Sequence, residues 1–154
     1  MDETDVILLV EDNPDDVALI RRAFRRAGLG ASIRLVADGE LAVAYLAGEA
    51  PYAEPGEHPL PAVILLDLML PRRSGFEVLE WLRAQPGLRR IPVVVLTSSE
   101  QAVDLDRAYD LGANSYLVKP VMVDALTALV RNVDQYWLGL NRRARPQRSA
   151  STAS

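Results

Sequence analysis

Each of four short apolar runs in the sequence ends directly in polar residues that could do chemistry. In chain order these are Glu11 and Asp12 after Val6–Val10, Asp67 after Val63–Leu66, Thr97 after Val93–Leu96, and Lys119 after Tyr116–Val118. If the runs are parallel strands of one sheet, their carboxyl ends lie at one edge, where open α/β sheets bind ligands. Acids, a hydroxyl and a lysine converging there suit a divalent cation and a phosphoryl group.

The three acids predict a metal site. Carboxylates of Glu11, Asp12 and Asp67 at neighbouring strand ends would repel one another, and a bound cation relieves that cost. Mg²⁺ prefers oxygen ligands and is often held by one or two carboxylates together with a phosphate. No histidine or cysteine stands at these strand ends to favour zinc. We therefore expect Mg²⁺ as the cofactor.

Asp67 can do more than bind a cation. A carboxylate is a competent nucleophile towards phosphorus and gives an aspartyl phosphate. Catalysis of phosphoryl transfer is mostly positioning and electrostatic stabilisation of the equatorial oxygens. Lys119 would supply a point charge to one oxygen and Thr97 a short hydroxyl donor to another.

The elements that must position these side chains alternate between strand-like and helical patterns five times. The apolar runs lack polar alternation, which is typical of strands buried on both faces of a parallel sheet. Helix boundaries are marked by Asn13, Pro14 and Gly28, by Asp38 and Gly48, and by the capping-box pattern Ser74 to Glu77. The next helix is expected from Ser98 to Gly112 and the last from Met122 to Trp137, and a proline-rich loop spans 49–61. The sequence predicts one doubly wound α/β domain with a five-stranded parallel sheet.

Composition narrows the function classes. Residues 141–154 carry four arginines and no acid, whereas the remaining 140 residues carry 13 basic and 21 acidic residues. An acidic body argues against direct DNA binding, whose footprint would be basic. The chain has no cysteine and no apolar stretch of membrane-spanning length, and a signal peptide is not evident, so we expect a cytoplasmic protein that does not enter a membrane. The tail 141–154 is expected to be disordered, with contact to an anionic partner as the alternative.

Four motifs resemble the receiver domains of two-component response regulators. They are Leu9-Val-Glu-Asp-Asn-Pro-Asp-Asp16, Leu66-Asp-Leu-Met-Leu-Pro71 followed by Gly75, Val95-Leu-Thr-Ser98, and Gly112-Ala-Asn-Ser-Tyr-Leu-Val-Lys-Pro120. The resemblance covers about residues 5–138, and we place the domain at 5–140. It implies a flavodoxin-like fold with strand order 2-1-3-4-5. The proline-rich loop, the Asn13 helix start and the ending at Tyr136 most resemble stand-alone receivers that partner phytochrome-type sensor kinases.

The resemblance also implies residue roles. Asp67 would be the phosphoacceptor, and Glu11, Asp12, Asp67 and the Met69 carbonyl would serve the metal. Thr97 and Lys119 would bind the phosphoryl group, and Tyr116 would be a switch aromatic coupled to Thr97. Lys119 would precede a cis bond to Pro120. A sensor histidine kinase would be the donor, and a protein that cannot be named from the sequence would read the phosphorylated state.

Each role has a simpler alternative. Glu11 and Asp12 could be a helix-start charge cluster, Thr97 a helix cap, and Tyr116 a core aromatic. Asp67 as a structural acid is disfavoured, because an unpaired charge beside a core strand is costly. His58 lies in the proline-rich loop, where we expect it at the surface.

Alternative functions differ by specific residues. A phosphatase of the haloacid dehalogenase type would need a second aspartate where Met69 stands, and a flavodoxin-like cofactor binder would need a phosphate loop in place of Glu11-Asp12-Asn13-Pro14. A phosphorylation-independent scaffold stays open. The family implies some self-catalysed phosphotransfer and dephosphorylation, but no turnover enzyme.

Two surfaces are candidates for protein contacts. Arginines line the polar side of the first helix, at positions 21, 22, 25 and 26. They are either a solvated face or a kinase-docking surface. Tyr136, Trp137 and Leu138 end the last helix and are either a satellite cluster over the core or a homodimer surface.

Overall fold

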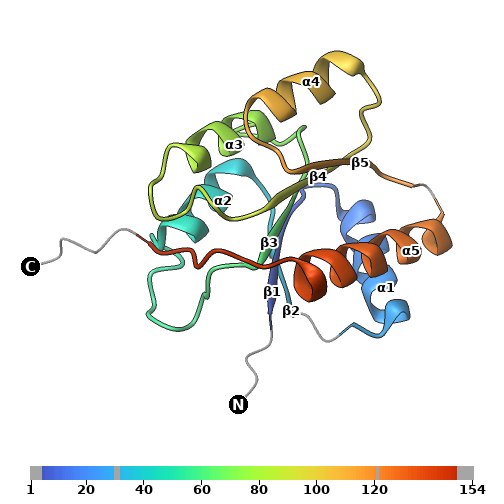
Figure 1. Cartoon of the computed structure of the whole chain (residues 1–154), viewed down its shortest axis with the longest axis horizontal. Coiled ribbons are helices and arrows are strands. Elements are labelled where there is room, and N and C mark those ends of the chain that lie inside the picture. Colours follow the sequence, from blue (N-terminus) through green and yellow to red (C-terminus); the bar gives the residue numbers. More distant parts are fainter. Residues whose placement is uncertain (1–4, 30–31, 121, 149–154) are drawn as a thin grey trace, which may run out of the picture.

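The five strands form one parallel sheet in the order β2-β1-β3-β4-β5, which confirms the predicted doubly wound topology. The structure is a computed structural model that describes residues 5–29, 32–120 and 122–148. The strands are β1 (Val6–Val10), β2 (Ser32–Val36), β3 (Val63–Leu66), β4 (Val93–Thr97) and β5 (Ser115–Val118). β1 pairs with β2 on one side and with β3 on the other (Figure 1).

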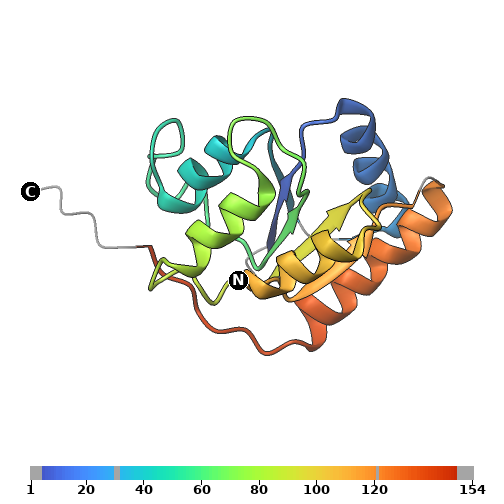
Figure 2. The same ribbon diagram turned by 90° about the horizontal axis from the view of Figure 1, so that it is seen from above.

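Helices cover both faces of the sheet. They are α1 (Pro14–Ala27), α2 (Gly39–Ala47), α3 (Gly75–Arg83), α4 (Ala102–Asp110) and α5 (Val123–Val133), followed by a π-helical segment η1 (Asp134–Leu140). α1 and α5 lie together on one face, and α2, α3 and α4 lie on the other (Figures 1 and 2). Within the described residues, no helix is both long and apolar enough for a membrane crossing.

The sheet has a separate apolar core on each face because side chains alternate along a strand. In β1, Leu8 and Val10 pack with α2 and α3, whereas Ile7 and Leu9 pack with α1 and α5. All five β1 residues are buried. The continuous apolar runs therefore have the origin that the sequence predicted, which is burial on both faces.

The predicted starts of α1 and α3 are confirmed by their capping hydrogen bonds. The Asn13 side chain accepts hydrogen bonds from the backbone N–H groups of Asp15 and Asp16, and Pro14 is the first helical residue of α1. Ser74 and Glu77 form both hydrogen bonds of a capping box at α3. Two boundaries differ: α4 begins at Ala102 rather than Ser98, and the last regular helix ends at Val133, where the π-helical segment η1 takes over.

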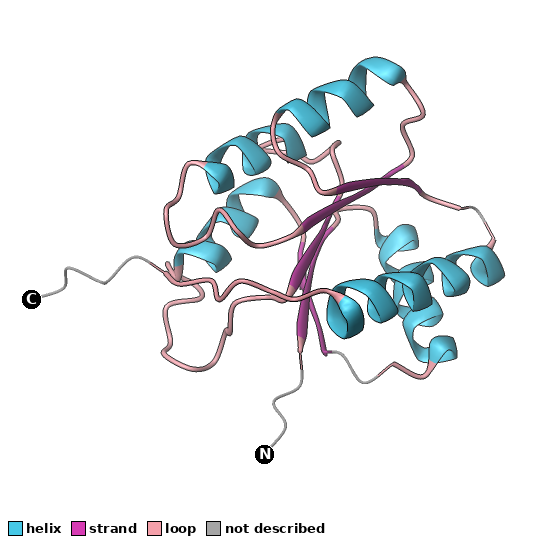
Figure 3. Cartoon of the chain, viewed as in Figure 1, coloured by secondary structure: helices cyan, strands magenta, loops and turns pink. Residues whose placement is uncertain are grey.

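The proline-rich loop before β3 is held by aromatic contacts. It appears in Figure 3 as the long irregular segment between α2 and β3. Tyr45 donates a hydrogen bond from its hydroxyl to the Pro59 carbonyl at 2.8 Å. The rings of Tyr45, Tyr52 and His58 meet edge to face, with centroids 5.1–5.8 Å apart. His58 therefore lies at the surface as a half-buried residue, because the rings of the two tyrosines cover part of it.

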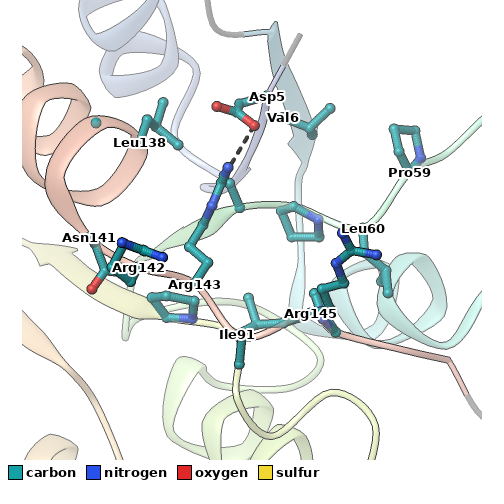
Figure 4. Close-up of a pocket in the computed structure, with 16 residues that line it drawn as sticks. Asp5, Val6, Pro59, Leu60, Ile91, Leu138, Asn141, Arg142, Arg143 and Arg145 are labelled. Atoms are coloured by element: carbon teal, nitrogen blue, oxygen red, sulfur yellow. Dashed lines mark hydrogen bonds and ion pairs between the residues drawn. The ribbon is translucent and has the colours of Figure 1, made fainter. Parts of the chain in front are cut away.

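Residues 141–148 follow the body of the domain rather than leaving it. Arg143 forms an ion pair with Asp5 at 3.0 Å, and the Gln147 backbone N–H donates to the Gly87 carbonyl at 2.7 Å. Arg148 donates to the backbone carbonyls of Tyr45, Leu46 and His58. Between this segment and the amino ends of the strands lies a cavity of about 560 Å³ (Figure 4).

These contacts set residues 141–148 against the folded domain, whereas the sequence predicted a disordered tail from residue 141. Composition alone gave no sign of them, because arginines that bind backbone carbonyls need a folded partner to supply the acceptors. The remaining residues of the predicted tail, 149–154, lie outside the described residues.

Candidate functional site

The carboxyl edge of the sheet brings the three predicted acids together. Val10 at the end of β1 pairs with Leu66 at the end of β3, so the residues that follow each strand are neighbours. One carboxylate oxygen from each of Glu11, Asp12 and Asp67 lies within 4.8 Å of the others. Glu11 and Asp67 are buried, at 2% and 6% exposure, whereas Asp12 is exposed. The cluster thus combines two buried acids with one that solvent can reach.

This donor set fits a hard divalent cation. It consists of carboxylate oxygens, with one exposed ligand through which a cation could enter. Met69 lies beside it, because its backbone N–H donates to Asp67 Oδ1 at 3.2 Å. That bond is made within the loop that follows β3, and it orients the Asp67 carboxylate. The Met69 carbonyl as a further ligand stays a prediction.

Lys119 lies between the acids and is almost fully buried. Its Nζ forms ion pairs with Glu11, with Asp67 Oδ2 at 2.9 Å and with Asp16 Oδ2 at 2.9 Å. Burial acts to lower the pKa of Lys119, but hydrogen bonds to these three carboxylates outweigh it and raise the pKa above its ordinary value. The lysine is therefore a fixed positive charge at the site.

Burial has the opposite consequence for Glu11. Desolvation raises the pKa of Glu11 to about 7, although hydrogen bonds from Lys119 and from the Asn13 backbone act to lower it. An acid with that pKa gains from a cation that favours its charged form. The burial and raised pKa of Glu11 therefore favour its role as a metal ligand over the helix-start alternative, which would place its side chain in solvent.

Thr97 carries an unpaired hydroxyl. The side chain is completely buried, and no described residue offers a hydrogen-bond partner to its Oγ1. The helix-cap alternative does not hold, since the residue at the cap position of α4 is Gln101. A buried hydroxyl without a partner costs about 1–3 kcal/mol. Such a hydroxyl is available to donate a hydrogen bond to an oxygen of a bound group.

Tyr116 is connected to the loop that follows Thr97. Its hydroxyl donates to the Ser99 carbonyl at 3.0 Å, and the Ser99 hydroxyl donates to Asp104 Oδ2 at 2.6 Å in the first turn of α4. Tyr116 is half-buried and packs on the core rather than lying wholly inside it. The ring thus links β5 to the start of α4, and its switch role stays a prediction.

The backbone around Lys119 contains one correction. The Lys119 N–H donates to the Thr97 carbonyl at 2.8 Å, which fixes β5 beside β4. Among the described residues, Ala50–Pro51 is the sole cis peptide bond, so Lys119–Pro120, predicted as cis, is trans. The trans form of an X–Pro bond is favoured by about 0.5–1 kcal/mol, and the local sequence contains nothing that specifies the rarer form.

Gly75 is required by the loop that follows Asp67. A Cβ atom at this position would lie 2.2 Å from the Asp67 carbonyl oxygen and 2.6 Å from Leu68 Cα, and the Gly75 N–H donates to the Leu68 carbonyl. The start of α3 therefore packs directly on the backbone of Asp67 and Leu68. This close approach explains the glycine that accompanies the Asp67 motif.

Asp16 is a site residue that the sequence analysis missed. Asp15 and Asp16 are both acids in the first turn of α1, where either charge complements the positive end of the helix dipole. In the structure Asp15 is exposed, whereas Asp16 is turned to Lys119. Its partner Lys119 lies 103 positions away in the sequence, so no local pattern distinguished Asp16 from Asp15.

Comparison with known proteins agrees with this geometry. The family model described as "Response regulator receiver domain" matches residues 7–131. The chain is 45% identical to the "Probable methanogenesis regulatory protein FilR2" of Methanothrix harundinacea, over 92% of this chain and 88% of that protein. It is 38% identical to the "Response regulator Rcp1" of Synechocystis, over 86% and 88% of the two chains.

Two solved structures share the fold closely. The phosphorylated cyanobacterial phytochrome response regulator RcpA matches with a TM-score of 0.83 and 38% identity, over 92% of this chain and 99% of that one. The Mn²⁺-bound form of Rcp1 matches with a TM-score of 0.80 and 36% identity, over 91% and 99%. The family model covers most of the sheet and helices described above, so the chain belongs to the response regulator receiver domain family.

Proposed function

We propose that Asp67 accepts a phosphoryl group from a sensor histidine kinase and that the chain relays the signal through a changed binding surface. The main support for this proposal is that Asp67 takes part in two arrangements at once. It belongs to the carboxylate cluster and is also paired with Lys119 at 2.9 Å. A structural ion pair would not need the cluster, and a simple metal site would not need the lysine.

In the transfer, one Asp67 oxygen attacks phosphorus while the P–N bond of the donor phosphohistidine breaks. The electron pair of that bond leaves with the imidazole nitrogen. Lys119 and the unpaired Thr97 hydroxyl would each bind a phosphoryl oxygen. The buried Thr97 hydroxyl would thereby gain the hydrogen-bond partner that the described part of the chain does not supply. Mg²⁺, held by Glu11, Asp12, Asp67 and the Met69 carbonyl, would supply charge neutralisation.

We infer a phytochrome-type kinase as the donor. Support comes from the relatives whose printed names connect them with phytochromes, such as RcpA, and from the nearly complete coverage of both chains in that comparison. Since the described residues contain one histidine, and His58 packs against Tyr45 and Tyr52 in the loop, a donor histidine must come from another protein.

Two other functions are weaker. A haloacid dehalogenase-type phosphatase would use an acid two residues after the nucleophile, where this chain has Met69 with its side chain 64% exposed. A phosphorylation-independent scaffold would have no use for a buried, unpaired Thr97 hydroxyl. We expect slow self-catalysed phosphorylation and dephosphorylation to accompany signalling.

The test is incubation with acetyl phosphate and Mg²⁺, followed by separation of phosphorylated from unmodified protein on a phosphate-affinity gel. We expect a shifted band that Asp67→Asn and chelator each abolish. A shift that survives Asp67→Asn, or none in the wild type, would contradict the proposal. A pull-down with and without beryllofluoride would then identify partners that read the modified state.

We infer that α4, β5 and α5 form the output surface. Exposed apolar side chains gather on these elements and the turn between them: Val103, Leu105 and Tyr109 on α4, Val118 at the end of β5, and Met122. Tyr116 connects them to the loop after Thr97 through the Ser99 carbonyl. Phosphorylation adds charge and acceptor oxygens at Asp67, and this connection gives the change a path to the surface.

We also propose a homodimer through the end of the chain's last helix. A groove of about 590 Å³ runs along α5 and β5 and includes Leu117, Leu129, Tyr136 and Trp137. Leu140 beyond it is 75% exposed. Analytical ultracentrifugation with and without beryllofluoride tests this, and a monomer at every concentration in both states would exclude it.

A further inference from the structure

Lys119 is held by three carboxylates at once. Its ammonium group has three hydrogens, and Glu11, Asp67 and Asp16 each provide an acceptor. The lysine side chain is 10% exposed, and the same figures are 1% for Glu11, 8% for Asp67 and 36% for Asp16. Lys119 therefore has all its donors used in this state, two by buried acids and one by an acid at the rim.

The three partners are not equivalent. Glu11 and Asp67 belong to the carboxylate cluster that fits a divalent cation, and Asp67 is the proposed phosphoacceptor. When these two coordinate a cation, their oxygens are shared with it and bind the ammonium less strongly. Asp16 lies outside that cluster, so within the described residues it is the partner of Lys119 that coordination leaves unchanged.

We propose that Asp16 is a positioning residue, which holds the Lys119 ammonium over the phosphoacceptor when Glu11 and Asp67 are engaged with the cation. This proposal rests on the proposed phosphoacceptor function of Asp67. A lysine side chain has four rotatable carbon–carbon bonds and loses rotamer entropy when its ammonium is fixed. Asp16 fixes the ammonium in advance, from the first turn of α1, whose start is held by the Asn13 cap.

The chain offers a matched control for this charge. Asp15 lies in the same first turn of α1, one residue before Asp16, and is exposed. Asp15→Asn and Asp16→Asn remove the same charge from the same helix end, so the dipole contribution is lost in both. The difference between the two variants therefore reports the contact with Lys119.

The first measurement is the rate constant for phosphorylation by acetyl phosphate at saturating Mg²⁺. We expect Asp16→Asn to lower it about tenfold, the equivalent of one charge-assisted hydrogen bond, and Asp16→Glu to recover part of the loss. Asp15→Asn should react like the wild type. In a Lys119→Ala background, Asp16→Asn should have no further effect. Equal slowing by Asp15→Asn, or a further effect without the lysine, would overturn the positioning role.

The second measurement follows the lysine directly, without turnover. Lys119 is the single lysine among the chain's 17 Lys and Arg residues, so ¹³C-labelled lysine gives one side-chain NMR spectrum. With Mg²⁺ and no phosphoryl analogue, the two Cε protons should be inequivalent in the wild type and in Asp15→Asn, as expected for a fixed side chain. They should average to one signal in Asp16→Asn, and an unchanged spectrum would refute the proposal.

The outcomes separate the two proposals. If the wild type is phosphorylated on Asp67 and Asp16→Asn matches it in rate and spectrum, the positioning role is wrong and the phosphoacceptor function stands. If the wild type takes no phosphoryl group, both fail. Thermal unfolding of each variant shows whether a slow variant is folded, and Asp16→Glu provides a second variant that keeps the charge.

Discussion

The Asp67 carboxylate and the Lys119 ammonium lie 2.9 Å apart, with both side chains about nine-tenths buried. The pair joins the end of β3 to the end of β5 across the intervening β4. Its energetic role therefore differs from that of the surface ion pairs. Removing one partner leaves the other as an uncompensated charge in a low-dielectric site.

Lys119→Met should accordingly lower the free energy of unfolding by about 3 kcal/mol in metal-free protein. Mg²⁺ should recover part of the loss, because a cation in the carboxylate cluster neutralises the charges left behind. Urea unfolding in chelator and in Mg²⁺ measures both effects. The control is Arg73→Met, which breaks the more exposed ion pair with Glu40 and should cost below about 1 kcal/mol. Equal costs for the two variants would contradict the prediction.

Glu11 should make stability depend on pH in the metal-free protein. Its pKa is raised by burial from 4.5 to about 7, so the folded state holds its proton more tightly than the unfolded state. This contribution is fully present below pH 4.5 and is lost as pH rises through about 7, with a total of about 3 kcal/mol. Glu11→Gln should remove that part of the pH dependence. Parallel stability curves for the two proteins in chelator would show the prediction to be wrong.

Met69 should lengthen the life of the phosphorylated state. Its backbone N–H binds Asp67, while its side chain is 64% exposed beside the acceptor and offers no hydrogen bond to an attacking water. Met69→Asn should hasten loss of phosphate several-fold, since each 1.4 kcal/mol by which its amide stabilises the transition state for water attack is tenfold in rate. Release of inorganic phosphate after removal of the donor measures it. Met69→Leu is the control, and an unchanged or longer lifetime for Met69→Asn would refute the idea.

Most of the fold and the site could be predicted because the relevant signals are local. Unbroken apolar runs predicted β1, β3 and β4, and Asn13 with Pro14 predicted the start of α1. Parallel strands end at one edge, so the residues after them had to meet there. The cluster of Glu11, Asp12 and Asp67 confirms that reasoning.

What could not be predicted depends on partners distant in the sequence. Asp16 and Lys119 are 103 positions apart, and nothing in the first turn of α1 distinguishes Asp16 from Asp15. The contacts of Arg148 lie 90 to 103 positions away and involve backbone carbonyls, which no side-chain pattern announces.

Arg148 should stabilise the end of α2. It donates to the carbonyls of Tyr45 and Leu46 in a helix whose last turn has no basic residue, and also to the His58 carbonyl. Arg148→Ala should cost about 1–2 kcal/mol in urea unfolding, as several hydrogen bonds from a charged donor are lost. It should also speed hydrogen exchange at the Gln147 amide, which binds the Gly87 carbonyl.

The matched control for Arg148 is Arg145, an exposed arginine of the same segment. Arg145→Ala should leave both the free energy of unfolding and the exchange rate at Gln147 near their wild-type values. If the two variants behave alike, the segment 141–148 contributes through its net charge rather than through the contacts of Arg148.

The arginines of α1 differ in whether they contact α5, and this difference decides which of them can test kinase docking. Arg26 forms an ion pair with Asp124 of α5 at 2.7 Å, whereas Arg22 is exposed. Arg22→Glu should lower the phosphotransfer rate from a phytochrome-type kinase about tenfold, because opposed charges steer association. The rate from acetyl phosphate should not change, since Asp67 and Lys119 are untouched. Arg26→Glu should add a loss of stability at the α1–α5 contact. If Arg22→Glu accepts phosphate from the kinase at the wild-type rate at low salt, the kinase does not dock on this face.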